Sequence, residues 1–303
     1  MSNKPAAQPA IGAKVFQDDA HMTDTPIRRF RRRFLRHKLG LVGVIVLLVL
    51  GFAALFAPVI AGQDPLIVNL RNIDAPPSNV HILGTDSVGR DNWARLVYGA
   101  RVSLSVGLVA VSIYMSIGVL LGGIAGYFGG RVDQLIMRFT DVMMCFPSFM
   151  LIITVASSLP PSIYNIMIII GIFGWTGSCR LVRGQFLSLR TLDYVTAARS
   201  VGVRDMRIIF RHILPNCIAP VIVSATMGLA GAIMTEAGLS FLGFGVQEPM
   251  PSWGSMVNVA MNLPVLQDLP WRWMPPAAAI AITVLAVNFA GDALRDAFDP
   301  HSV

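Results

Sequence analysis

The sequence predicts an all-α integral membrane protein with six transmembrane helices and both termini in the cytoplasm. The first observation is the composition, because 54% of the residues are hydrophobic and only 14% are charged. An ordinary soluble domain carries about 25% charged residues. The second observation is a series of apolar stretches long enough to cross a bilayer. The third is an unequal distribution of Lys and Arg between the connections.

The composition also excludes several classes of function. The 24 Lys and Arg residues outnumber the 17 Asp and Glu residues, and they lie in short segments between apolar runs. Membrane lipid is therefore the expected partner of this basic chain, and nucleic acid is not. Cys145, Cys179 and Cys217 have no CxxC spacing. This argues against a metal site or a disulfide framework and favours three small buried hydrophobic residues.

Six segments have the length and composition of spanning helices. The uncharged stretch from Val142 to Cys179 is too long for one span, and the turn at Pro160-Pro161 divides it into two. Another apolar stretch, 239–246, is short and is expected to be re-entrant or interfacial. The predicted spans are 40–62, 102–128, 139–157, 163–182, 216–235 and 276–294.

The basic residues orient these spans. With six spans, 19 of the 24 Lys and Arg residues fall on one side of the membrane, which is therefore the cytoplasmic side. Residues 1–26 are expected to be a mobile tail. The predicted segments are a basic cytoplasmic tail with an interfacial helix (1–39), a first transmembrane helix (40–62), an outer segment (63–101), a five-helix core (102–294) and a cytoplasmic tail (295–303).

One cytoplasmic connection, 183–215, differs from an ordinary loop, and we call it the basic loop. Tyr194, Ala197, Ala198 and Val201 recur at the spacing of one helical face. Gly202 is then expected to end the helix, because glycine commonly occupies this position. The sequence therefore predicts a short amphipathic helix inside the loop.

A second amphipathic helix is predicted to follow in the basic loop. The same spacing recurs at Met206, Ile209, Phe210 and Ile213. Leu214-Pro215 is expected to end this helix and to begin the fifth span. Two interpretations are open: both helices lie on the inner leaflet, or they dock against another protein.

The order Thr196-Ala197-Ala198-x-x-x-Gly202, followed by Leu214-Pro215, resembles the EAA loop of ABC importer permeases. The family pattern is Glu-Ala-Ala, three residues, Gly, nine residues, Ile, one residue, Leu-Pro. Thr196 replaces the usual Glu, and His212 replaces the usual Ile. The first departure removes a carboxylate that a docking contact would use.

Further motifs are similar to those of dipeptide and oligopeptide permease C-type subunits, in order from residue 28 to residue 300. Together they make the resemblance specific to that group. They are Leu83-Gly84-Thr85-Asp86-x-x-Gly89-Arg90-Asp91, Gly126-Tyr127-Phe128-Gly129-Gly130, Leu239-Ser240-Phe241-Leu242-Gly243, Trp253-Gly254 and Gly291-Asp292-x-Leu294-Arg295-Asp296.

The resemblance implies a type I ABC importer permease fold in a bacterial inner membrane. The implied partners are a homologous second permease subunit, two ATPase subunits, and a periplasmic or lipid-anchored substrate-binding protein. The chain has no G-x-x-x-x-G-K-[ST] phosphate loop. ATP and Mg are therefore expected on the ATPase subunits, with no cofactor and no enzymatic activity in this chain. Di- or oligopeptides are the expected substrates, with nickel chelates, glutathione or another small solute as alternatives.

The resemblance also implies two sets of functional residues, none of them catalytic or metal-binding. Substrate-binding residues are not assigned, because the lumen and packing faces of a span are both small and apolar. Thr85 is further expected to cap an outer helix from Arg90 to Tyr98. The ATPase-coupling set is Asp193, Tyr194, Thr196, Ala197, Ala198, Gly202, Arg204, Leu214 and Pro215. The periplasmic set is Gly84, Thr85, Asp86, Gly89, Arg90 and Asp91.

Other features have simpler expected roles. Asp141 and Glu236 are interpreted as interfacial charges at helix ends, within reach of water. The overlapping GxxxG spacing of Gly118, Gly122 and Gly126 favours close helix packing. Trp253, Trp271 and Trp273 are expected to be interfacial anchors or, less simply, contacts with a binding protein.

Two other function classes make different predictions for the sequence. A self-contained secondary transporter predicts inverted repeats and buried ionisable residues, and the sequence shows neither clearly. An intramembrane hydrolase needs a nucleophile and a base that face each other. The chain has no GxSxG, and His81 and His212 fall on opposite sides of the membrane in the six-span arrangement. The importer permease is therefore the favoured hypothesis.

Overall fold

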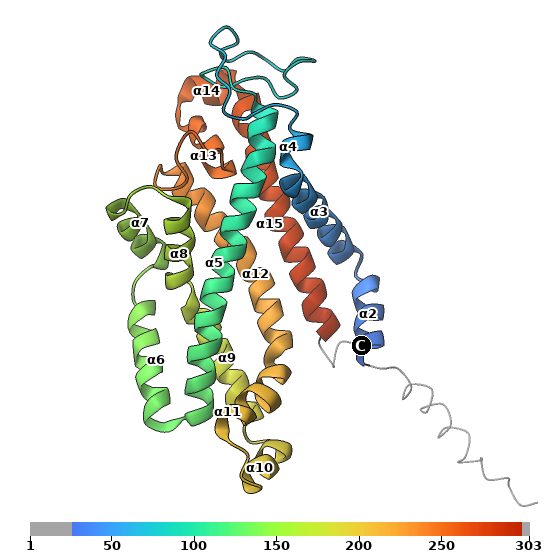
Figure 1. The fold of residues 1–303 in the computed structure, drawn as a ribbon, viewed down its shortest axis with the longest axis vertical. Helices are drawn as coiled ribbons and strands as arrows, with labels where there is room; N and C mark the ends of the chain where they lie inside the picture. Colours follow the sequence, from blue (N-terminus) through green and yellow to red (C-terminus); the bar gives the residue numbers. More distant parts are fainter. Residues whose placement is uncertain (1–25, 299–303) are drawn as a thin grey trace, which may run out of the picture.

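The computed structural model describes residues 26–298, which are built almost entirely of helices (Figure 1). Within this range the only β pairing is an isolated bridge between Thr85 and Asp91. The predicted mobile tail and the last residues of the C-terminal tail lie outside the described residues. The helices are α2 Pro26–Arg36, α3 Lys38–Leu55, α4 Ala57–Ile60, α5 Asn92–Phe128, α6 Gly130–Met144, α7 Ser148–Ser158, α8 Ile163–Phe173, α9 Trp175–Leu189, α10 Asp193–Ser200, α11 Asp205–Ile208, α12 Leu214–Phe241, α13 Trp253–Asn258, α14 Leu263–Asp268 and α15 Pro270–Phe298.

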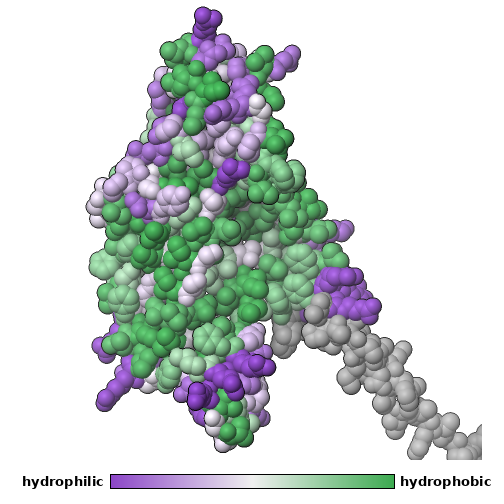
Figure 2. All heavy atoms as spheres, viewed as in Figure 1, coloured by the Kyte–Doolittle hydropathy of each residue, from purple (hydrophilic) through white to green (hydrophobic). Residues whose placement is uncertain are grey.

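The helices account for the six predicted spans. Four helices are long and apolar enough to cross a membrane: α3, α5, α15 and the continuous helix Asp205–Phe241. The pairs α6 with α7 and α8 with α9 pass the same test when each bent pair is counted as one span. Figure 2 shows hydrophobic residues over the middle of the molecule and polar residues at both ends. The chain is therefore a multi-pass membrane protein.

Two predicted spans are broken, which the sequence analysis missed. The axis turns by 77° between α6 and α7 and by 41° between α8 and α9. Pro147 precedes α7 and lacks the N–H that would continue the ladder from α6. Cys145 lies at this bend and is exposed, so the prediction that it is buried is wrong. Cys179 and Cys217 are buried, as predicted.

The second span starts earlier than predicted. Helix α5 begins at Asn92, where the carboxylate of Asp91 accepts a hydrogen bond from the backbone N–H of Ala94 at 2.8 Å. The expected separate outer helix capped by Thr85 is therefore wrong. Thr85 is fully buried, and its hydroxyl instead accepts from the N–H of Ala75 and donates to the carbonyl of Asn72.

The predicted break at Leu214-Pro215 is also wrong. The chain runs from α11 through a π-helical turn, η3 (Ile209–Ile213), directly into α12. The wider π turn lies at the residues where the proline ring would meet the preceding turn of an α-helix. Helix α12 then continues to Phe241, so the stretch predicted as re-entrant begins as the last turn of this helix.

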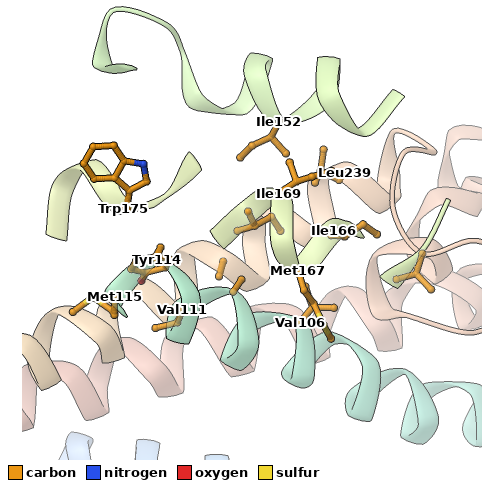
Figure 3. Packing of buried hydrophobic residues seen from close by; sticks show 14 of the residues in the cluster. Val106, Val111, Tyr114, Met115, Ile152, Ile166, Met167, Ile169, Trp175 and Leu239 are labelled. Carbon is orange, nitrogen blue, oxygen red and sulfur yellow. The ribbon is translucent and has the colours of Figure 1, made fainter. Parts of the chain in front are cut away.

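The most extensive helix packing is between α5 and α9, and it is close, as the glycine spacing predicts. A Cβ atom on Gly126 would lie 2.5 Å from the Cβ of Phe186, and one on Gly118 would collide with Ser178. Beside this contact, a core of buried hydrophobic residues joins α5 to α7, α8, α9 and α12 (Figure 3). Its members include Val106 and Met115 of α5, with Ile152, Ile169 and Leu239 facing them.

We expect Gly122→Ala to destabilise the protein by about 1–3 kcal/mol, the usual cost of overpacking a tight contact. The new methyl group would collide with the carbonyl oxygen of Cys179 and lie 3.0 Å from the Cβ of Val182. Thermal unfolding in detergent measures the effect. Gly184→Ala in α9 is the matched control, since no atom lies within 4 Å of its new Cβ. Equal unfolding temperatures for the two variants would contradict the close-packing interpretation.

Candidate functional site

The first helix of the basic loop is present as predicted. Helix α10 is followed by Gly202, whose φ of +79° is left-handed. The N–H of Gly202 donates to the carbonyl of Arg199 at 3.0 Å, and that of Val203 donates to Ala198 at 3.1 Å. This pair of bonds is a Schellman motif, which ends a helix firmly and sets the direction of the following chain.

Most of the predicted apolar face of α10 is exposed. The side chains of Tyr194 and Val201 are 41% and 80% exposed, Ala197 is exposed, and Ala198 is half-buried. The loop is instead anchored by Val195, which is fully buried and was not assigned a face by the periodicity. The described chain therefore leaves an apolar surface of α10 uncovered.

The rest of the coupling set lies around this helix. Asp193 and Thr196 are exposed in its first turn, where the Thr196 hydroxyl donates to the Asp193 carbonyl at 2.9 Å. Arg204 is exposed at the start of α11. Leu214 is half-buried and Pro215 is exposed, and both lie within the continuous helix Asp205–Phe241.

The predicted periplasmic set forms one compact structure at the opposite end of the molecule, which we call the cap segment (residues 61–91). Gly84 and Gly89 have φ values of +63° and +76°. A Cβ on either would collide with a backbone carbonyl, from Ala75 and Asn69 respectively. Only glycine fits these two turns.

Ion pairs tie the cap segment to distant parts of the chain. The carboxylate of Asp86 accepts from the guanidinium of Arg90 at 2.6 Å. Arg90 and Arg95 both donate to Glu248, at 2.5 and 2.7 Å. Burial disfavours the charged form of the Arg90 guanidinium and by itself would lower its pKa. The hydrogen bonds and negative charges of Glu248 and Asp86 have the larger combined effect, so the pKa of Arg90 is raised. Sequence analysis missed Arg95 and Glu248, which no local motif connects.

The cap segment is also fastened to α15 and α5. Arg272 of α15 donates to Asp74 at 2.8 Å, and the Asp91 that caps α5 lies 2.8 Å from the ring of His81. Trp253 is 1% exposed and donates from its indole N–H to the carbonyl of Leu96, so its expected place as an interfacial anchor is wrong. This tryptophan holds α13 against α5.

Glu236 is fully buried, so its interpretation as a water-accessible interfacial charge is wrong. Its two carboxyl oxygens accept from the hydroxyls of Ser103 on α5, at 3.1 Å, and Ser240 on α12, at 2.7 Å. Ser103 also accepts from the backbone N–H of Trp253 at 3.2 Å. The cluster joins α5, α12 and α13. Asp141, by contrast, is exposed and paired with Arg180, as expected for an interfacial charge.

An apolar cavity of about 790 Å³ runs along α5 and α12. Its α5 wall includes Val111, Met115, Leu120 and Phe128, and Phe210 of the basic loop also lines it. The few polar side chains in the lining are hydroxyls. Within residues 26–298 no group of three or more His, Cys, Asp or Glu residues could hold a metal ion.

These features define a class of protein: a multi-pass permease subunit with an apolar cavity and an uncovered helix at one end. The chain belongs to the family of binding-protein-dependent transport system inner membrane components, which matches residues 118–302. Residues 25–77 match the N-terminal transmembrane domain of oligopeptide transport permease C. The predicted resemblance to peptide permease C-type subunits is thereby confirmed.

Individual relatives cover nearly the whole chain. The dipeptide transport system permease protein DppC of Alkalihalophilus pseudofirmus is 42% identical over 283 residues, 93% of this chain and 92% of the relative. The oligopeptide transport system permease protein OppC of Bacillus subtilis is 41% identical over 268 residues, 88% of this chain and 87% of the relative.

The fold is also similar to a chain of the MetNI methionine ABC transporter in an inward-facing conformation. The TM-score is 0.54 at 16% identity, and the match covers 68% of this chain and 97% of the other. This likeness confirms the predicted ABC importer permease fold.

Proposed function

We propose that the chain forms half of the translocation pathway of an ATP-driven importer of di- or oligopeptides. Its relatives are dipeptide and oligopeptide transport permeases, and its cavity lies along two long helices. Two separate ATPase subunits supply the ATP and Mg chemistry, and a homologous second permease covers the apolar cavity. Nickel chelates, glutathione or another small solute are the alternative cargo for the same machinery.

The observation that carries the proposal is the uncovered apolar surface of α10. Helix α10 lies at the tip of the molecule (Figure 1), and Tyr194, Ala197 and the adjoining Val201 are exposed. Exposed apolar side chains on a rigid, capped helix are suited to a protein groove. In this proposal α10 docks in an ATPase subunit, with Asp193, Thr196 and Arg204 at the edge of the contact. The resulting movement opens and closes the cavity.

The distribution of charge supports one orientation. In this proposal the end of the molecule with the basic loop and the arginines of α2 faces the cytoplasm of a bacterium, with the chain in its inner membrane. Phe30 of α2 contacts Phe298 of α15, with ring centroids 4.6 Å apart, so the two ends of the described chain lie together. Both termini are then cytoplasmic, and the cap segment faces a periplasmic or lipid-anchored binding protein.

Reconstitution tests this function. The chain, its second permease, the ATPase pair and the binding protein would be placed in proteoliposomes and offered labelled di- to pentapeptides, a nickel chelate and glutathione. We expect peptide uptake that needs ATP and the binding protein. Uptake by this chain without an ATPase would contradict the proposal and favour a secondary transporter. Uptake of the nickel chelate or glutathione, with no uptake of peptides, would show that the cargo is one of these alternatives.

A further inference from the structure

One side chain of α5 touches both helical parts of the basic loop. Tyr127 lies one residue before the end of α5 and is 5% exposed. Its hydroxyl donates to the carboxylate of Asp205, the first residue of α11, at 2.5 Å. The guanidinium of Arg199, in the last turn of α10, lies 5.4 Å from the centre of its ring. This distance is within the range of a cation–π contact.

The backbone around Tyr127 is held as well. The last carbonyls of a helix lack partners within the helix. Here Arg190, at the end of α9, donates to the carbonyls of Gly126 at 2.9 Å and Tyr127 at 3.2 Å. The tyrosine ring also belongs to a buried cluster that includes Val195 of α10 and Ile208 of α11. The end of α5 is therefore clamped by α9, α10 and α11.

The direct connection from α10 to α12 is weaker. Tyr194 donates to the carbonyl of His212 at 3.5 Å and accepts from Asn216 at 3.3 Å, and both hydrogen bonds are exposed. A hydrogen bond to a carboxylate at 2.5 Å is shorter and stronger than these. Besides the continuous helix that joins α11 to α12, Tyr127 thus links α10 and α11 to α5, which lines the apolar cavity.

We infer that Tyr127 is a positioning residue that transmits movement of the basic loop to α5 and so changes the cavity. The inference deepens the proposed function and rests on it, because an ATPase must move α10. Tyr127 holds Asp205 and Arg199 at once, so α10 and α11 move with the end of α5. Removing the hydroxyl breaks the polar link between α5 and α11 while the ring keeps its packing.

The test measures movement of α5 in the assembled transporter, with no need for a known cargo. Spin labels at positions 109 and 285, both exposed and outside the cavity lining, would report the distance between α5 and α15 in a Cys145→Ser background. Distances would be recorded without nucleotide and after trapping with ATP and vanadate, together with the ATP hydrolysis rate. The variants are Tyr127→Phe and Asp205→Ala, each of which removes one partner of this hydrogen bond. Tyr164→Phe is the control, since Tyr164 is 71% exposed on α8.

We expect the nucleotide-dependent distance change to be present in the parent and the control and lost in both variants, while ATP hydrolysis persists. A coupling free energy between sites typically corresponds to about fivefold or more, and we expect uptake per ATP to fall by at least that factor. The double variant should show no larger loss of uptake per ATP than either single variant, because both substitutions remove the same hydrogen bond.

Three results would overturn the inference. One is an unchanged distance shift in Tyr127→Phe and Asp205→Ala. Another is a parent transporter that hydrolyses ATP without any movement of α5. The third is loss of assembly in both variants, which would reduce Tyr127 to a structural role. A parent chain that never binds an ATPase would instead reject the proposed function itself.

Discussion

Gly202→Val is expected to abolish ATP-driven uptake while the chain still inserts and assembles. Gly202 has a φ of +79°, a conformation that a β-branched residue adopts only with strain, at a cost of about 1–3 kcal/mol. No atom lies within 4 Å of the added Cβ, so the effect is conformational and not a collision. Valine would break the Schellman motif and redirect α10, and the uncovered surface would no longer meet its partner.

Measured together, uptake and ATP hydrolysis in proteoliposomes check this result. Gly202→Asn is the matched control, because asparagine tolerates left-handed backbone far better than valine. We expect the asparagine variant to keep most of its uptake. Normal ATP-driven uptake by Gly202→Val would show that the capped end of α10 does not set the docking geometry.

Gly89→Val is expected to disrupt the cap segment and abolish uptake stimulated by the binding protein. The position has a φ of +76°, and its Cβ would collide with the carbonyl of Asn69. Because the neighbouring Arg90 pairs with Asp86 and Glu248, displacement here would also break the ion pairs that fasten the segment. Basal ATP hydrolysis at the opposite end should persist.

Limited proteolysis of the cap segment and uptake with and without binding protein measure this effect. Gly62→Val separates collision from strain, because Gly62 has a φ of +66° but no atom within 4 Å of its Cβ. We expect Gly62→Val to remain resistant to protease and active. A Gly89→Val protein that responds normally to the binding protein would disprove the role of the cap segment.

Most of the correct predictions depend on patterns among residues that are close together in the sequence. The helical spacing of α10 and the glycine that ends it depend on residues close in sequence, and so does the GxxxG face of α5. Apolar length alone predicted six spans. The family resemblance could be stated because its motifs occur in order along the chain.

The errors involve contacts between residues far apart in the sequence. Arg95 and Glu248 are separated by 153 positions, and Glu236 meets Ser103 across 133. Burial of Glu236 depends on how three helices meet, which hydropathy along one helix does not encode. The bends at Pro147, between α6 and α7, and at Gly174, between α8 and α9, lie within an uncharged stretch that was divided only at Pro160-Pro161. The π turn before Pro215 keeps a helix intact where local rules predict its end.

Photo-cross-linking from α10 tests the central claim most directly. A photoreactive amino acid at position 201, where the native valine is 80% exposed, would be activated in membranes that contain the full transporter. The account predicts an adduct with an ATPase subunit, and none from position 67, which is 63% exposed in the cap segment. Adducts from position 201 with lipid alone would contradict the account.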